Sequence, residues 1–163
     1  MNISFRPIEA ADVGSLLPVY NHYVRTSTAT FHTEEIDAGT FEALLFPGYP
    51  RYDSWAVLAD GALAGYVILA RYKPREAYDG SAEVTIYLDQ AFAGKGLGSA
   101  ALAFVEARAR ERAFHNLLAI ICGENMASIR LFEKYSYKKC AHYHEVGRKF
   151  DRWLDVVSYE KLL

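Results

Sequence analysis

The sequence predicts an α+β fold in which helices cover the faces of a mixed sheet. Strand-like runs dominate the first and last parts of the chain. Between them lies a unit of strand, glycine-rich loop, helix, strand and helix. The chain has 163 residues, of which 52% are hydrophobic and 23% charged, and we therefore expect one globular domain over 1–163.

The first third of the chain predicts one strand and two helices. Residues 3–8 alternate between apolar and polar side chains, which is typical of a half-buried strand. Asp12 is a candidate N-cap for the helix that follows, and residues 26–31 are polar or β-branched and predict a loop. A short second helix is expected over 40–46, because Pro47 and the residues after it end the pattern.

The rest of the chain predicts the remaining strands and helices. Residues 55–59 and 62–71 are strand-like and are joined at Asp60-Gly61, a favoured pair for a tight hairpin turn. The further elements expected are a strand over 83–88, a helix over 97–113, a strand over 117–122, a helix from Asn125 or Ser128 to Tyr135, and strands over 139–146 and 153–159.

Composition and charge argue against several classes of protein. The formal net charge of -2 argues against nucleic acid as a main partner. No apolar run is long enough to span a membrane, and the N-terminus lacks a secretory signal pattern, so we expect a cytoplasmic protein. Cys122 and Cys140 make neither a disulfide framework nor a zinc site. His142 and His144 point to one side of a strand, but no third ligand is evident, so no metal site is predicted.

A glycine-rich loop before the predicted helix over 97–113 carries the strongest sign of chemistry. The loop consists of Ala93, Gly94, Lys95, Gly96, Leu97, Gly98 and Ser99. Alternating glycines let the backbone approach a ligand closely, and the N–H groups at a helix N-terminus favour a phosphate or pyrophosphate. Lys95 could add a positive charge. The plainer alternative is a helix start that is punctuated by glycines.

Two common phosphate-binding loops do not fit this pattern. A Walker loop needs Ser or Thr after its lysine, whereas Gly96 follows Lys95. A dinucleotide-binding loop follows a first strand, and an acidic residue closes the next strand. Here the loop lies in the middle of the chain, and residues 117–122 contain no acidic residue.

Two motifs, in this order and spacing, resemble the GNAT acyltransferase superfamily. Gly96 and Gly98 match its first motif, Arg/Gln-x-x-Gly-x-Gly/Ala between a strand and a long helix. Ala93 stands where the family usually has Arg or Gln, which removes one side-chain contact to the pyrophosphate. Residues 125–137 resemble its second motif, Asn-x-x-Ser-Ile-x-Leu-Tyr-Glu-Lys-x-Gly-Phe. The resemblance implies a GNAT fold, a mixed and mostly antiparallel twisted sheet with helices on both faces, and acetyl-CoA as co-substrate.

Nearly the whole chain also resembles the phosphinothricin acetyltransferase-like branch, which includes methionine sulfoximine and methionine sulfone acetyltransferases. The matching segments are residues 20–23, 28–31, 73–78, 83–87 and 147–156. This resemblance implies direct attack by a small amine acceptor within a ternary complex. Residues 149–153 resemble the tail that helps to build a dimer in this branch, so we expect a homodimer. The alternative is a monomer whose last strand closes the sheet.

The resemblance implies roles for the predicted strand over 83–88. Glu83 is the candidate general base, acting directly or through a water, and partial burial would raise its pKa. A strand-end glutamate in solvent is the plainer alternative. Tyr87 is expected to face the acceptor, although a strand tyrosine is more often packed in a core. Main-chain atoms of Ile86 and Leu88 are expected to hold the cofactor arm, and an N–H near Leu88 to serve as the oxyanion donor.

The predicted helix after Asn125 is expected to complete the cofactor site. Asn125 and Ser128 are expected to contact the cofactor arm, although both also fit the pattern of helix caps. Phe132 stands where the family often has Tyr or His, and it can neither donate nor accept a proton. Either the thiolate leaves with only hydrogen-bond help, or another group such as Tyr135 serves as the acid.

The resemblance implies four candidates for binding the acceptor: Lys73, Arg75 and Tyr78, which match the acceptor-binding segment of the branch, and Phe31, which is expected to wall the same pocket. Arg75 offers a planar fork that suits a carboxylate or phosphinate, and Lys73 adds a second positive charge. The alternative is an exposed basic loop. The leading function is therefore acetylation of the α-amine of a small amino acid or analogue. Acetylation of protein or peptide N-termini or of polyamines, and a non-catalytic acyl-CoA sensor, are the competing hypotheses.

Overall fold

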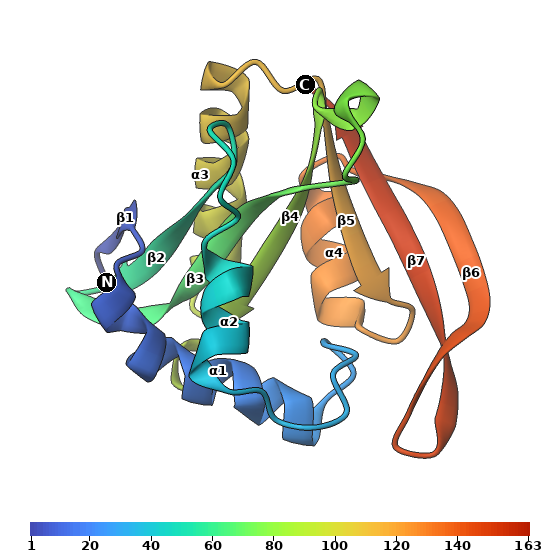
Figure 1. The fold of residues 1–163 in the computed structure, drawn as a ribbon, viewed down its shortest axis with the longest axis horizontal. Helices are drawn as coiled ribbons and strands as arrows, with labels where there is room; N and C mark the ends of the chain where they lie inside the picture. Colours follow the sequence, from blue (N-terminus) through green and yellow to red (C-terminus); the bar gives the residue numbers. More distant parts are fainter.

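Seven strands form one mixed sheet in the computed structural model, which describes residues 1–163 (Figure 1). The strands are β1 (Ile3–Pro7), β2 (Asp53–Ala59), β3 (Ala62–Arg71), β4 (Ser81–Leu88), β5 (Asn116–Cys122), β6 (Lys138–Lys149) and β7 (Arg152–Leu162). The helices are α1 (Val13–Thr26), α2 (Ala38–Leu45), α3 (Leu97–Glu111) and α4 (Met126–Lys134). The α+β class expected from the sequence is confirmed. None of the helices combines the length and the apolar character that crossing a membrane requires.

The strands follow the order β1-β2-β3-β4-β5-β7-β6. Strands β4 and β5 run parallel, and every other pair of neighbours is antiparallel. The mixed, mostly antiparallel sheet implied by the resemblance is therefore confirmed. Strands β6 and β7 form a long hairpin at one edge of the sheet, drawn in orange and red in Figure 1.

Helices cover both faces of the sheet, as expected. Neighbouring residues of a strand point to opposite faces. Tyr66 and Ile68 of β3 pack against α1 and α2, whereas Val67 and Leu69 pack in the core beneath α3 and α4. In Figure 1 the first pair of helices lies in front of the sheet and the second pair behind it. The alternation of apolar side chains along the central strands thus separates two cores.

Asp12 occupies the predicted N-cap position of α1, but its side chain does not cap the helix. The carboxylate accepts no hydrogen bond from that helix. Both carboxylate oxygens instead accept hydrogen bonds from the Arg6 guanidinium at 2.7 Å, and one also accepts from the Glu9 N–H at 2.9 Å. The paired guanidinium lowers the pKa of Asp12. Asp12 therefore ties β1 to the start of α1.

The β6–β7 hairpin is longer than the sequence predicts. The last paired residues are Lys149 and Arg152, so only Phe150 and Asp151 form the turn. Both turn residues have positive φ, 52° and 56°. Two-residue turns of this kind are usually recognised by Asn-Gly or Asp-Gly, and Phe-Asp lacks the glycine that signals them.

Candidate active site

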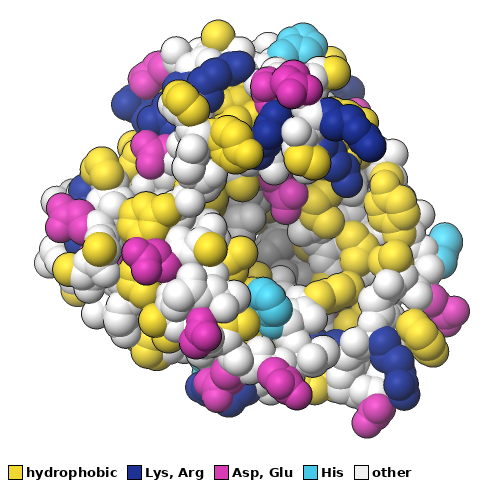
Figure 2. Space-filling model, in the orientation of Figure 1, with side chains coloured by type: hydrophobic (Ala, Val, Ile, Leu, Met, Phe, Trp, Pro, Cys, Tyr) yellow, Lys and Arg dark blue, Asp and Glu magenta, His cyan; other side chains and the backbone are white.

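A cavity opens where β4 and β5 separate. The two strands pair at only three positions, from Ser81 to Glu83 on β4, and then diverge. A cavity of about 740 Å³ lies in the resulting gap, lined by both strands, the first turns of α3 and α4, and the loop over 27–31. Figure 2 shows this face of the molecule hollowed at its centre, with acidic and basic side chains along one rim.

Glu83 lies at the point where the two strands part. It is the last residue of β4 that pairs with β5, opposite Leu118, and its half-buried side chain lines the cavity. Burial raises the pKa of the Glu83 carboxyl, and the positive charge of Lys73 partly opposes that shift. A carboxylate with a raised pKa at the edge of a cavity is suited to accepting a proton near neutral pH.

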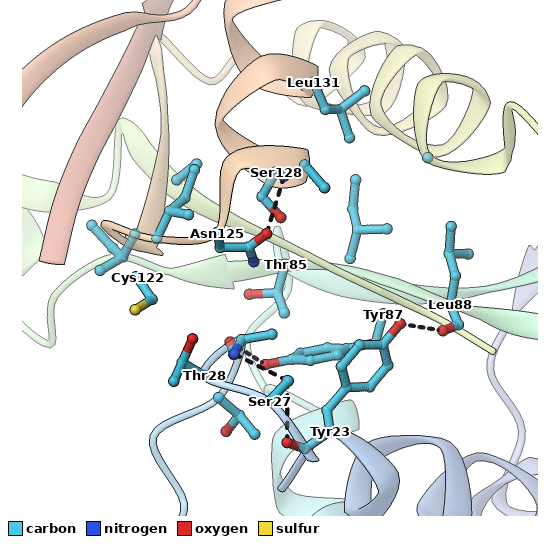
Figure 3. A pocket seen from close by; sticks show the side chains of 18 of the residues that line it. Tyr23, Ser27, Thr28, Thr85, Tyr87, Leu88, Cys122, Asn125, Ser128 and Leu131 are labelled. Atoms are coloured by element: carbon cyan, nitrogen blue, oxygen red, sulfur yellow. Dashed lines mark hydrogen bonds between the residues drawn. The ribbon is translucent and has the colours of Figure 1, made fainter. Parts of the chain in front are cut away.

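The main chain of β4 offers hydrogen-bonding groups to the gap. The Asp89 N–H donates to the Ala64 carbonyl at 2.8 Å on the β3 side. Because main-chain groups alternate along a strand, those of Ile86 and Leu88 point the other way, where β5 has diverged. The Leu88 carbonyl accepts from the Tyr23 hydroxyl at 2.6 Å, as Figure 3 shows. The amide groups of Ile86 and Leu88 therefore lie at the cavity, where the sequence predicts them.

The glycine loop brings the N-terminus of α3 to the same cavity. Gly96 is the N-cap of α3 with φ of 83°, a left-handed conformation that a side chain would strain. A Cβ at Gly98 would lie 3.3 Å from Cδ2 of Leu131 in α4, so the glycine permits close approach of the two helices. Gly98 and Ala93 line the cavity. The helix N-terminus adds main-chain N–H donors and the positive end of a dipole.

Other residues of the glycine loop do not line the cavity with their side chains. Leu97 is only 1% exposed and packs in the core, so it can offer a ligand its amide alone. The Lys95 ammonium donates to the Ala91 carbonyl at 2.8 Å within the loop. The Ser99 carbonyl accepts from the Tyr135 hydroxyl at 2.8 Å. Gly94 has a positive φ of 72° and is exposed.

The start of α4 forms the opposite wall. The side chain of Asn125 accepts a hydrogen bond from the Ser128 N–H at 3.2 Å, and both residues line the cavity (Figure 3). Asn125 therefore caps α4 and also lines the cavity, whereas Ser128 caps nothing and supplies the main-chain N–H that Asn125 binds. Phe132 also lines the cavity, whereas Tyr135 does not, and the Tyr135 hydroxyl donates a hydrogen bond to the Ser99 carbonyl. Tyr135 is thus not placed to protonate a leaving thiolate.

Tyr87 belongs to an aromatic cluster and also lines the cavity. Its ring packs against Tyr20, Tyr23 and Tyr66, with ring centroids 5.2 to 5.6 Å apart. Its hydroxyl donates to the Ala29 carbonyl at 3.0 Å, as Figure 3 shows, and burial raises the pKa of Tyr87. Tyr87 is therefore a packed aromatic residue that also lines the cavity, and its expected contact with the acceptor stays a prediction.

The predicted acceptor-binding residues fall into two groups. Phe31 lines the cavity, and its ring lies directly against Gly147 of β6, where a Cβ would come within 2.2 Å. Lys73, Arg75 and Tyr78 lie instead in the exposed connection between β3 and β4 and do not line the cavity. Of these three residues, only Lys73 is seen to act on Glu83: its positive charge lowers the pKa of the Glu83 carboxyl.

The structure adds a set of contacts that the residue patterns do not predict. The β6–β7 hairpin and Glu124, the second residue after β5, hold the loop over 27–31. Lys149, only 3% exposed, donates to the Thr30 carbonyl at 2.8 Å, and its burial lowers the pKa of its ammonium. Arg152 donates to both carboxylate oxygens of Glu124, at 2.9 and 3.0 Å, and Thr28 donates to Glu124 at 2.9 Å. One wall of the cavity therefore depends on the hairpin.

Comparisons with known proteins identify the family. Residues 16–137 match the sequence profile of the Acetyltransferase (GNAT) family. The L-methionine sulfoximine/L-methionine sulfone acetyltransferase of Pseudomonas paraeruginosa is 32% identical over 160 residues, covering 96% of this chain and 92% of that protein. The phosphinothricin N-acetyltransferase of Streptomyces coelicolor is 32% identical over 166 residues, covering 99% and 96%.

A solved structure agrees with these sequence relatives. The crystal structure of a GNAT superfamily phosphinothricin acetyltransferase from Sinorhizobium meliloti, in complex with AcCoA, has a TM-score of 0.94 and 27% identity. The alignment covers 100% of this chain and 89% of that one. The family profile, the relatives matched over nearly the whole chain and the shared fold together show that this chain belongs to the acetyltransferase (GNAT) family.

Proposed function

We propose that the protein transfers the acetyl group of acetyl-CoA to the α-amine of a small amino acid or analogue of the phosphinothricin or methionine sulfone type. Family membership makes it an acetyl-CoA-dependent acetyltransferase. The curated relatives matched over nearly the whole chain support the class of acceptor. The observation that carries the proposal is the half-buried Glu83 at the fork between β4 and β5, with its raised pKa and with Lys73 nearby.

The residues of the cavity fit the coenzyme. Acetyl-CoA supplies the activated acyl group. Main-chain amides of residues 94–99 are suited to its diphosphate, and those of Ile86 and Leu88 to the amides of its pantetheine arm. Asn125 and Ser128 face the same gap.

Glu83 accepts the proton of the acceptor amine, directly or through a water, as the amine nitrogen bonds to the acyl carbon in a ternary complex. The Leu88 amide donates to the carbonyl oxygen as negative charge develops on it. The carbon–sulfur bond breaks, and the electron pair leaves with the sulfur as a thiolate. Phe132 has no proton to give, so we expect the thiolate to leave with hydrogen-bond help alone.

A thiol-release screen tests the proposal. Purified protein and acetyl-CoA would be mixed with methionine sulfone, methionine sulfoximine, phosphinothricin, ordinary amino acids, a short peptide and spermidine. We expect turnover with small acceptors that carry a free α-amine beside a carboxylate. If only peptides or polyamines are acetylated, the acceptor class is wrong. If acetyl-CoA binds and no amine is acetylated, the result favours the non-catalytic acyl-CoA sensor over the enzyme.

Arg75 is expected to select acceptors by their carboxylate. Its side chain is exposed in the connection between β3 and β4, which also carries Lys73, whose charge reaches Glu83. Replacing Arg75 by Ala removes a charge-assisted hydrogen bond, which should raise KM for methionine sulfone by about tenfold and leave KM for acetyl-CoA unchanged. An Arg110→Ala variant, which removes an exposed arginine of α3, serves as the control. An unchanged preference for carboxylate-bearing acceptors would show that Arg75 has no such role.

We also propose a homodimer formed through the tip of the β6–β7 hairpin. Phe150 is 49% exposed and Trp153 is 62% exposed, and exposed aromatic residues of this kind often anchor interfaces. Trp153→Asp is expected to convert a dimer into a monomer in light scattering, whereas Trp153→Phe should stay dimeric. A wild-type protein that is monomeric across the concentration range would contradict this. The cytoplasmic location expected from the sequence stays a prediction.

A further inference from the structure

Three side chains of the β6–β7 hairpin converge outside the cavity described above. His142 pairs with Val157, and extra residues of β6 oppose β7 between Tyr143 and Gly147. Because residues two apart in a strand share a face, His142 and Asp155 lie on the face of Val157. That face carries the core beneath α4. Tyr143 pairs with Val156, so the next residues along the two strands are His144 and Asp155, just where the register begins to shift. Asp155 therefore supplies the third partner that the sequence alone does not reveal.

The ligand atoms of these residues lie close together. His142 Nε2 is 2.7 Å and His144 Nδ1 is 3.3 Å from the same oxygen, Oδ2 of Asp155. The two imidazole rings stack with centroids 4.1 Å apart, and the ligand atoms all lie within 4.8 Å of one another. Ligands bound to one zinc ion at about 2.0–2.2 Å lie about 3–3.5 Å apart. Small rotations of exposed side chains would bring these atoms to that separation.

We propose that His142, His144 and Asp155 bind one divalent transition-metal ion of the zinc class, with water completing its coordination. Two imidazole nitrogens and one carboxylate oxygen suit zinc, whereas magnesium and calcium prefer oxygen ligands alone. The site is separate from acetyl transfer and does not depend on the proposed acceptor. The side chain of His144 is 77% exposed, which leaves room for water.

Two neighbours affect metal binding: the Glu145 N–H orients the Asp155 carboxylate, and the Lys139 side chain occupies the other ring nitrogen of His142. The other oxygen of Asp155, Oδ1, accepts from the Glu145 N–H at 2.8 Å, which leaves Oδ2 directed at the histidines. A hydrogen bond of this kind fixes the orientation of a metal ligand. Lys139 Nζ lies 3.0 Å from His142 Nδ1. Metal binding through Nε2 places the proton of His142 on Nδ1, so the exposed Lys139 side chain must turn away.

An ion at this position would cross-link β6 to β7. The far end of the same hairpin holds the loop over 27–31 through Lys149 and Arg152. The cross-link would therefore stiffen the strands that support one wall of the cavity.

Calorimetric titration with zinc chloride tests the site, using full-length protein from which any affinity tag and bound metal have been removed. We expect one zinc ion per chain in the wild type and in a His115→Ala control, which removes an exposed histidine elsewhere. His144→Ala should bind at least about tenfold more weakly. Cobalt should give the visible absorption of a four-coordinate ion in the wild type and in the His115→Ala control, but not in His144→Ala.

Three results would overturn the proposal. The first is a wild-type protein that takes up no stoichiometric zinc. The second is a His144→Ala variant that binds zinc as tightly as the wild type. The third is an excess of magnesium that displaces the ion. Because His144 is exposed, its loss should leave the far-UV circular dichroism unchanged, so a change in binding reports the ligand itself.

Discussion

A Glu83→Gln variant is expected to lose about 10²- to 10⁴-fold in kcat/KM for acetyl transfer, the usual contribution of a positioned general base. The amide keeps the shape of the side chain but cannot accept the amine proton. Binding of acetyl-CoA, measured by calorimetry, should be unchanged, because we propose that the main chain of β4 and the start of α3 hold it. Glu42→Gln, on the exposed surface of α2, serves as the control.

The pH profile separates a base from a merely structural carboxylate. Glu83 accepts a proton only when it is ionised, and burial raises its pKa, so kcat/KM should fall as pH falls through that raised value. Glu83→Gln should remove this acidic limb. Because Lys73 lowers the pKa of Glu83, Lys73→Met should move the limb to higher pH. A Glu83→Gln enzyme as fast as wild type at every pH would exclude the base role.

A Gly98→Val variant is expected to weaken acetyl-CoA binding by about 5- to 150-fold. A Cβ at this position would already lie 3.3 Å from Leu131 and 3.9 Å from Leu88 at the cavity, so the larger side chain crowds the gap. Overpacking of this kind costs about 1–3 kcal/mol, which corresponds to that range of dissociation constants. Calorimetric titration with acetyl-CoA measures the effect directly.

Gly14→Val provides the matched control for Gly98. Gly14 lies in the first turn of α1, and a Cβ there would meet no atom within 4 Å. The control should bind acetyl-CoA as the wild type does, although valine is a poorer helix former than alanine. Equal affinity of all three proteins would show that the start of α3 does not hold the coenzyme.

The sequence predicts those parts of the site that depend on neighbouring residues. Gly96 and Gly98 mark the start of α3, because a left-handed N-cap and a close helix contact both require glycine. Asn125 likewise caps α4 where the motif places it. Order and type of the strands and helices follow from local periodicity and turn residues in the same way.

Features that depend on distant segments are not visible in the sequence. The fork at Glu83 exists because β5 leaves β4 after three pairs, a consequence of how the whole sheet twists and pairs. Lys149 meets Thr30 across 119 residues of chain, and His142 meets Asp155 only because β6 pairs with β7 in this register. The length of the hairpin is not predicted for a local reason. Phe150 and Asp151 both adopt positive φ, but the pair Phe-Asp is not one of the sequences that usually mark such a turn.

A crystal structure of the protein with acetyl-CoA tests most directly whether the gap between β4 and β5 holds the coenzyme. We expect the diphosphate within hydrogen-bond distance of main-chain amides of residues 94–99, and the pantetheine arm beside Ile86 and Leu88. We also expect the thioester next to the Glu83 end of the fork. Coenzyme bound elsewhere, with the bend over 93–99 unoccupied, would contradict the assignment of this cavity as the active site.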